Sequence, residues 1–230
     1  MKSGDPENPV LYPPVWSNIY YRKTQLRKEI EEVAEKYLSY GGKQILVDYG
    51  CGTKPYEPIL SPYVSEYIGL DITEAENVDR VLAEDGTSSL PDSTADVVLS
   101  SQVLEHVPDP VRYLNEAHRL LEKDGLLLLS THGHMIYHPV PEDYWRWTHR
   151  GLRKMLKQTN FTIGELRGII GKAATGGQFL LDGVRPALPE ACQGAFNLLM
   201  QGIIGFLDHD VFNPNLDKDA SIFLVVARKW

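Results

Sequence analysis

The sequence predicts an α/β domain in which helices cover both faces of a parallel β-sheet. Short apolar segments recur along the chain, several ending in an acid or a small polar residue, and segments with apolar residues at helical spacing lie between them. This alternation is typical of parallel sheets whose crossover connections are helices. Seven segments are expected to be strands: 44–48, 66–71, 79–85, 95–101, 125–132, 161–167 and 221–229.

The expected helices follow from apolar spacing and from their end signals. Residues 22–40 carry apolar side chains at helical spacing and stop at a glycine pair. Residues 109–123 show the same spacing after Asp109, whose carboxylate suits a helix N-terminus. A third helix is expected at 148–158. Residues 171–219 are expected to form an insertion of helices and loops before the last strand.

Composition limits the classes of partner and the location. The chain has 230 residues, enough for a single domain, with 43% hydrophobic and 23% charged residues. Its formal net charge of −8 argues against broad binding of nucleic acid or anionic membrane. The longest apolar stretch, 196–207, is too short to span a membrane. No secretory signal and no disulfide framework are visible, so we expect a cytoplasmic protein.

Polar residues at strand ends mark a candidate nucleotide site. The first strand runs into Gly50-Cys51-Gly52, a turn in which backbone can approach a ligand closely. Asp71 ends the second expected strand, where an acid can accept hydrogen bonds from ribose hydroxyls. Asp85 ends the third. Because open α/β sheets bind ligands at the carboxyl ends of their strands, we expect these residues to converge.

Four segments together resemble the class I S-adenosylmethionine-dependent methyltransferases of the methyltransferase-11 type. They are VDYGCGTKPY, YIGLD, AEDGTSSLPDSTADVVLSSQVLEHVPDP and EAHRLLEKDGLLLLS. The resemblance covers residues 44–131 and extends to about 165, where PEDYWRWTHRGLRKMLKQTNF is similar to a bacterial subgroup often associated with surface-glycan biosynthesis. It implies a Rossmann-like three-layer sandwich whose seven-stranded sheet is mostly parallel with an antiparallel last strand.

The resemblance also implies a layout of one methyltransferase domain over 1–230. Its parts would be an N-terminal arm and helix (1–43), a cofactor-binding half (44–131), an acceptor-side loop and insertion (132–170 and 171–219) and the last strand (220–230). Aromatic residues of the arm, Tyr12, Trp16, Tyr20 and Tyr21, suit either a lid over the cofactor or a hydrophobic staple onto the domain.

Carried over residue by residue, the resemblance assigns a cofactor site for S-adenosyl-L-methionine. The carboxylate of Asp48 would lie near the methionine amino group, Asp71 would hold the ribose hydroxyls and Ile72 would pack on the adenine. His106 would start the following helix. The full set of expected cofactor-binding residues is Asp48, Gly50, Cys51, Gly52, Asp71, Ile72, Asp85, Gly86, Ser101, Gln102 and His106. One departure from the pattern is Lys54-Pro55 in place of the third glycine, which argues against a regular first helical turn there.

The acceptor side is expected in the loop after the fifth strand. His132 and His134 are the candidate general bases, because histidine titrates near neutral pH and a hydroxyl acceptor must lose a proton. An HxH pair can also bind a metal, but no cysteine or carboxylate completes a set, so no metal site is expected. The candidate substrate-binding residues are His138, Tyr144, Trp145 and Arg146, the last as a clamp for an anionic group.

The expected function is methyl transfer to a small-molecule acceptor, such as a hydroxyl of a sugar, a glycolipid precursor or another metabolite. Two alternatives remain at this point. A nicotinamide-dependent oxidoreductase shares the general fold, but it would use a GxGxxG turn, whose third glycine is missing here. A non-catalytic protein that binds S-adenosylmethionine would keep the same strand-end residues. The sequence gives no strong signal for nucleic acid, and it leaves the oligomeric state open.

Overall fold

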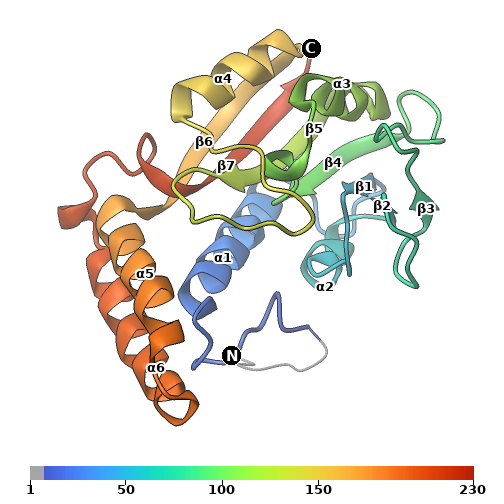
Figure 1. Ribbon diagram of the computed structural model, residues 1–230. Helices are drawn as coiled ribbons and strands as arrows, with labels where there is room; N and C mark the ends of the chain where they lie inside the picture. The colour runs from blue at the N-terminus through green and yellow to red at the C-terminus, as the bar shows by residue number, and fades with distance from the viewer. Residues whose placement is uncertain (1–7) are drawn as a thin grey trace.

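The strands form one mixed sheet. The computed structural model describes residues 8–230, in which seven strands are ordered β3-β2-β1-β4-β5-β7-β6 (Figure 1). Their bounds are Ile45–Tyr49 for β1, Glu66–Asp71 for β2, Arg80–Val81 for β3, Ala95–Ser101 for β4, Leu121–His132 for β5, Phe161–Gly171 for β6 and Ala220–Lys229 for β7. Strands β1 to β5 pair in parallel, whereas β7 runs antiparallel to both β5 and β6. The predicted three-layer α/β fold with an antiparallel last strand is therefore confirmed.

Helices cover the two faces of this sheet (Figure 1). One apolar cluster joins the sheet to α1 (Tyr20–Tyr37), α2 (Glu57–Leu60), α5 (Lys172–Val184) and α6 (Glu190–Leu207). A second cluster on the other face joins it to α3 (Pro110–Leu120) and α4 (His149–Gln158). Short 3₁₀ turns complete the chain at Ser61–Tyr63, Leu104–His106, Arg185–Ala187 and Asp210–Phe212.

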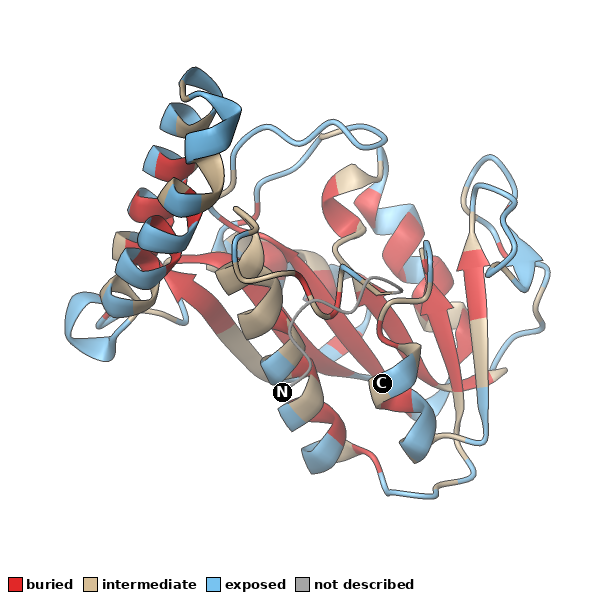
Figure 2. Cartoon of the chain, turned by 90° about the horizontal axis from the view of Figure 1, so that it is seen from below, coloured by how far each residue is buried: buried red, intermediate tan, exposed pale blue. Residues whose placement is uncertain are grey.

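The central strands are apolar on both sides because each side meets helices. In β5, Leu126 and Leu128 belong to one cluster, and Leu127 and Leu129 belong to the other. Figure 2 shows the central strands as a mostly buried layer, whereas β2, β3 and β6 carry intermediate and exposed residues. A strand buried on both faces has room for ligand-binding polar groups mainly at its ends, which directs the candidate site to the carboxyl edge of the sheet.

Several predicted elements differ in extent, the third and sixth strands among them. The third strand, expected over 79–85, pairs with β2 only at Arg80–Val81, so Asp85 lies in the turn beyond it. The short α2 agrees with the expectation that prolines prevent a regular helical turn after the glycine loop, since Pro58 lies within its four residues. The expected strand at 161–167 is longer than predicted and reaches Gly171.

The insertion at 171–219 forms a helical pair, α5 and α6, that holds the start of α1. The side-chain oxygen of Gln201 in α6 accepts the backbone N–H of Tyr21 at 2.8 Å, and its amide donates to the carbonyl of Asn18 at 2.9 Å. Asn197 donates to the carbonyl of Trp16 at 2.8 Å. These two polar residues interrupt the apolar stretch 196–207 because they bond the backbone of the arm. No helix within residues 8–230 is both long and apolar enough to cross a membrane.

The carboxyl group of Asp48 is buried between strands β1 and β2. The side chain is 2% exposed, and its Oδ2 accepts a hydrogen bond from the Tyr67 hydroxyl of β2 at 2.7 Å. Burial raises the pKa of Asp48 to about 7, against the lowering effect of that hydrogen bond and of Lys54. The folded protein therefore holds a proton on Asp48 at pH values where the unfolded chain has lost it.

This proton makes stability depend on pH in a defined window. The contribution of Asp48 is fully present below its ordinary pKa of 3.8 and is lost as the pH rises to about 7. We expect Asp48→Asn to remove this component, so that the variant gains stability relative to the natural protein between pH 4 and about pH 7. Urea unfolding across that range measures the difference. Tyr67→Phe, which removes the hydrogen bond, should extend the window to higher pH, and a pH-independent difference for Asp48→Asn would contradict the assignment.

Candidate functional site

A cavity of about 880 Å³ opens at the carboxyl edge of the sheet. Its wall is built from the glycine loop after β1, the ends of β2 and β4, the start of α1 and the loop that follows β5. Its volume lies within the range of roughly 300–1,000 Å³ that is usual for ligand pockets. The cavity is therefore large enough for a nucleotide-type cofactor together with a small acceptor.

The glycine loop has the backbone conformation that its residues allow. Gly50 and Gly52 have φ angles of +89° and +52°, in the left-handed region that favours glycine. A Cβ on Gly50 would lie 2.6 Å from a methyl group of Val103, so close packing also requires glycine there. A Cβ on Gly52 would meet open space. Both glycines and the buried Cys51 line the cavity.

Asp71 connects this loop to the end of β2. Its Oδ2 accepts the backbone N–H of Gly52 at 2.8 Å, and both residues line the cavity. Ile72 also lines it and is 56% exposed, which leaves an apolar face free for a flat ring. The structure thus places Asp71 and Ile72 together with the glycine loop. Asp48, by contrast, is not part of the cavity wall, because its carboxylate faces Tyr67.

Lys54 and Pro55 stand where the glycine loop of the family pattern has its third glycine. The φ of Lys54 is +50°, a left-handed conformation for a residue with a side chain. The side chain passes over Gly69 of β2, where a Cβ would lie 2.3 Å from Lys54 Cε. Its ammonium group reaches the Oδ2 of Asp79 at 2.5 Å. Because Gly69 of the neighbouring strand has no side chain, it leaves room for the Lys54 side chain.

The region of Asp85 and Gly86 closes another side of the cavity. Both residues line it, but the Asp85 carboxylate already binds Arg112 and accepts the backbone N–H of Thr87 at 2.9 Å. The Tyr49 hydroxyl donates to the carbonyl of Gly86 at 2.6 Å. Asp85 therefore comes from a turn held by its own contacts, and the prediction that it ends a strand is wrong.

Ser101 and Gln102 lie at the end of β4, as predicted, and both line the cavity. Their side chains hydrogen-bond to the Ser130 hydroxyl of β5, at 3.0 Å and 3.1 Å. His106 also lines the cavity, but it ends the turn Leu104–His106. The prediction that His106 starts the following helix is wrong, since α3 begins at Pro110 after the Asp109 cap.

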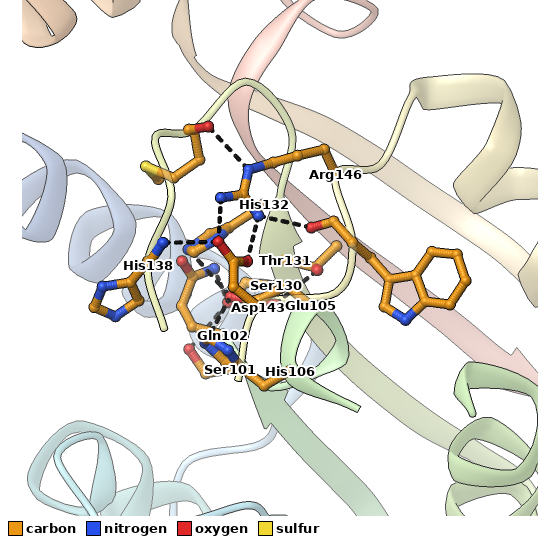
Figure 3. A network of polar contacts seen from close by, with 12 residues as sticks. Ser101, Gln102, Glu105, His106, Ser130, Thr131, His132, His138, Asp143 and Arg146 are labelled. Atoms are coloured by element: carbon orange, nitrogen blue, oxygen red, sulfur yellow. Dashed lines mark hydrogen bonds and ion pairs between the residues drawn. The ribbon is translucent and has the colours of Figure 1, made fainter. Parts of the chain in front are cut away.

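His132 lies beside a buried acid at the end of β5 (Figure 3). Its Nε2 is 3.1 Å from Glu105 Oε1, and the Thr131 hydroxyl donates to the other oxygen of Glu105 at 2.8 Å. Burial and nearby cations, mainly Arg146 and Arg22, lower the pKa of His132 to about 3, so the ring is neutral near pH 7. Its Nδ1 is buried without a hydrogen-bond partner among residues 8–230.

His106 and His138 complete a group of three imidazoles. Their ring centroids lie 6.0 Å and 6.2 Å from that of His132 and 5.7 Å from each other. All three histidines line the cavity. Burial also lowers the pKa of His138. The three imidazoles therefore lie together in the cavity wall. In residues 8–230 no cluster of histidine, cysteine and acidic side chains has the arrangement of a metal site.

Four other residues of the loop after β5 do not reach the cavity. The His134 ring binds Asp219 at 2.6 Å and is exposed, so its prediction as a base is wrong in placement. Arg146 is held by Asp143 (Figure 3) and by the carbonyls of Met135, Ile136 and Trp145. Tyr144 and Trp145 are exposed, with their backbone N–H groups on the Glu105 carbonyl. Of the predicted substrate-binding residues, only His138 lines the cavity.

Sequence reasoning missed two cations that line the cavity, Arg22 and Lys23. Both lie in the first turns of α1, where they resemble ordinary solvated charges in the sequence. One signal could have found them. The first turn of α1 contains no acid, although the positive end of a helix dipole favours acids over cations at that place.

Comparisons with known proteins relate this chain to methyltransferases. Residues 19–166 match a family model described as a methyltransferase domain. A probable S-adenosylmethionine-dependent methyltransferase of Mycolicibacterium smegmatis is 31% identical over 107 residues, covering 43% of this chain and 41% of that protein. A ubiquinone biosynthesis O-methyltransferase of a Ruegeria species is 31% identical over 124 residues, covering 48% and 50%. The matches thus span half or less of these relatives.

A solved structure shares the fold. The 1,6-didemethyltoxoflavin-N1-methyltransferase of Burkholderia thailandensis, crystallised with its acceptor and S-adenosylhomocysteine, superposes with a TM-score of 0.55 at 15% identity. The superposition covers 90% of this chain and 78% of that one. At this level of identity, the similarity shows the architecture alone.

The residues of the cavity fit S-adenosylmethionine. The left-handed glycines leave a backbone cradle that side chains would fill, the Asp71 carboxylate can accept hydrogen bonds from ribose hydroxyls, and exposed Ile72 offers an apolar face to a purine. The family model matches residues 19–166, more than half of this chain. The chain belongs to the methyltransferase domain family.

Proposed function

We propose that this protein transfers the methyl group of S-adenosylmethionine to a hydroxyl of a small-molecule acceptor. The observation that carries the proposal is a single cavity whose wall contains the glycine loop, Asp71 and the neutral His132. When bound, the cofactor supplies an activated sulfonium methyl group. The protein then has to orient the acceptor, exclude water and remove a proton.

The cofactor half of the proposal assigns separate tasks to the loop residues. Gly50 and Gly52 allow close approach of the backbone to the methionine part of the cofactor. Asp71 accepts hydrogen bonds from the ribose, and its bond to Gly52 fixes the carboxylate before the cofactor arrives. Ile72 covers one face of the adenine, while Gly86 and the Asp85 backbone meet its edge.

The proton-removing step is assigned to His132. Glu105 Oε1 lies 3.1 Å from Nε2 without a hydrogen bond, and Nδ1 has no partner among residues 8–230, so we assign proton acceptance to Nδ1. Burial raises the pKa of the Glu105 carboxyl group, and the Thr131 hydroxyl that donates to it acts in the opposite direction. Because the pKa of His132 is lowered to about 3, the ring is in its proton-accepting form throughout the neutral range.

The acceptor class rests on several kinds of support. The negative net charge disfavours nucleic acid as the acceptor, and the cavity has the size of a small-molecule site. The matched ubiquinone biosynthesis enzyme is named as an O-methyltransferase, which favours oxygen as the methylated atom. We propose a hydroxyl of a sugar, of a glycolipid precursor or of another metabolite. Both core clusters share one sheet, which supports a single domain, and two free cysteines, one of them exposed, suit the cytoplasm.

The experiment that tests the function is release of S-adenosylhomocysteine from S-adenosylmethionine. The purified protein is incubated with panels of sugars, nucleotide sugars, lipid-linked precursors and phenolic metabolites. Acceptor-dependent release with the mass of a methylated product supports the proposal. Tight binding of S-adenosylhomocysteine without turnover on any panel would favour a non-catalytic cofactor-binding protein.

We expect Asp71→Ala to weaken binding of S-adenosylhomocysteine by about 10- to 100-fold, because it removes a charge-assisted hydrogen bond to the ribose. Isothermal titration calorimetry measures the dissociation constant. Glu76→Ala provides the control, since Glu76 is an exposed acid in the same loop and does not line the cavity. Equal affinities of the Asp71→Ala variant and the natural protein would contradict the ribose assignment.

We expect His132→Gln to lower kcat by about 100-fold or more on the acceptor found in the panel, since general-base catalysis usually contributes that much. His134→Gln is the matched control. Its side chain is exposed and bonded to Asp219, and kcat should stay close to that of the natural protein. Binding of S-adenosylhomocysteine should be the same in both variants. A His132→Gln variant with full kcat would rule out this histidine as the base.

A further inference from the structure

Most of the charges that line the cavity come from two groups of elements, while Arg112 pairs with Asp85. Asp71, Glu84 and Asp85 come from the ends of β2 and β3 and the following turn, on the cofactor side. Arg22 and Lys23 come from the start of α1. They lie on the side of the histidines, since Arg22 contacts the sulfur of Met135 in the loop after β5 and its charge lowers the pKa of His132 and His138.

Arg22 and Lys23 form no ion pair in the part of the chain that the structure describes. No carboxylate oxygen of residues 8–230 lies within 4.0 Å of a charged nitrogen of either residue, so Asp182 and Glu105 act on them only from a longer distance, whereas Arg112 of the same wall pairs with Asp85. The polar contact of Arg22 is a thioether, Met135 Sδ, at 2.9 Å, which is a weak acceptor. Arg146, the residue expected to clamp an anion, is already saturated by Asp143 and three carbonyl groups.

The protein holds these two cations in place despite their mutual repulsion. Burial and the charge of Arg22 lower the pKa of Lys23 to about 8. The backbone that carries them is fixed on the α5–α6 pair: Gln201 accepts the N–H of Tyr21, and the Tyr21 hydroxyl donates to Asp208 at 3.0 Å. Charges that are partly buried, adjacent and unpaired are unfavourable unless a ligand of opposite charge joins them.

We propose that the acceptor carries an anionic oxyacid group, a phosphate or a carboxylate, which Arg22 and Lys23 bind at the acceptor end of the cavity. The planar guanidinium of Arg22 can bind two oxygens of such a group, and Lys23 adds a point charge. This deepens the methyltransferase proposal and rests on it. The same pair disfavours acceptors with a protonated amine, because like charges would meet. Sugar phosphates and hydroxy acids are the kinds of hydroxyl compound that fit both ends of the cavity.

The test measures binding of inorganic phosphate and of malonate to the protein loaded with S-adenosylhomocysteine. Isothermal titration calorimetry compares the natural protein with Arg22→Gln, Lys23→Gln and the control Lys28→Gln. Lys28 lies on the same helix but is exposed and does not line the cavity. We expect at least one of the two anions to bind, with affinity about tenfold or more lower in Arg22→Gln and Lys23→Gln and unchanged in Lys28→Gln. The preferred anion identifies the oxyacid.

Two further measurements make the outcomes distinct. Thermal unfolding shows that each variant is folded, and Arg22→Lys and Lys23→Arg should recover part of the lost anion affinity. The proposal is overturned if neither anion binds, or if the Arg22→Gln and Lys23→Gln variants bind anions as well as the natural protein does. Affinity for S-adenosylhomocysteine is measured in every variant. Its loss from the natural protein would refute the proposed function, whereas failure of anion binding alone refutes only the choice of acceptor.

Discussion

Burial of the central strands on both faces is the constraint on which the rest of the structure depends. Helices on either side leave no room for polar ligand-binding groups along β1, β4 and β5, so such groups gather where the strands end. Parallel pairing of β1 with β2 and β4 brings those ends to one edge. The glycine loop, Asp71 and Ser101 meet there although they are far apart in the sequence. The site is thus a consequence of topology as much as of individual side chains.

The cofactor half could be predicted because its signals are local. Gly50, Gly52 and Asp71 follow short apolar strands directly, and a strand fixes the direction in which the next residue leaves the sheet. Asp48 could not be placed in the same way. Alternation along β1 turns its carboxylate toward Tyr67, and a one-residue shift along a strand changes the face that a side chain occupies.

The acceptor half was harder to predict because loop residues are placed by tertiary contacts. His132 and His134 are two residues apart, yet one contacts buried Glu105 and the other contacts exposed Asp219. Arg146 carries the charge that could bind an anion, but it already forms an ion pair with Asp143, three residues earlier in the chain. Glu105 organises this region, since its carboxylate lies beside His132 and its carbonyl accepts the N–H groups of Tyr144 and Trp145. None of these pairings follows from residue spacing alone.

The α5–α6 pair positions one half of the site, the start of α1, and has no part in the other half around Asp71. It enters the chain between β6 and β7, away from the glycine loop, and its polar side chains fix the start of α1. A replacement of this helical pair would therefore reposition Arg22 and Lys23 and leave the residues around Asp71 untouched. In this chain the elements that present the two cations can therefore vary independently of the elements that present Asp71.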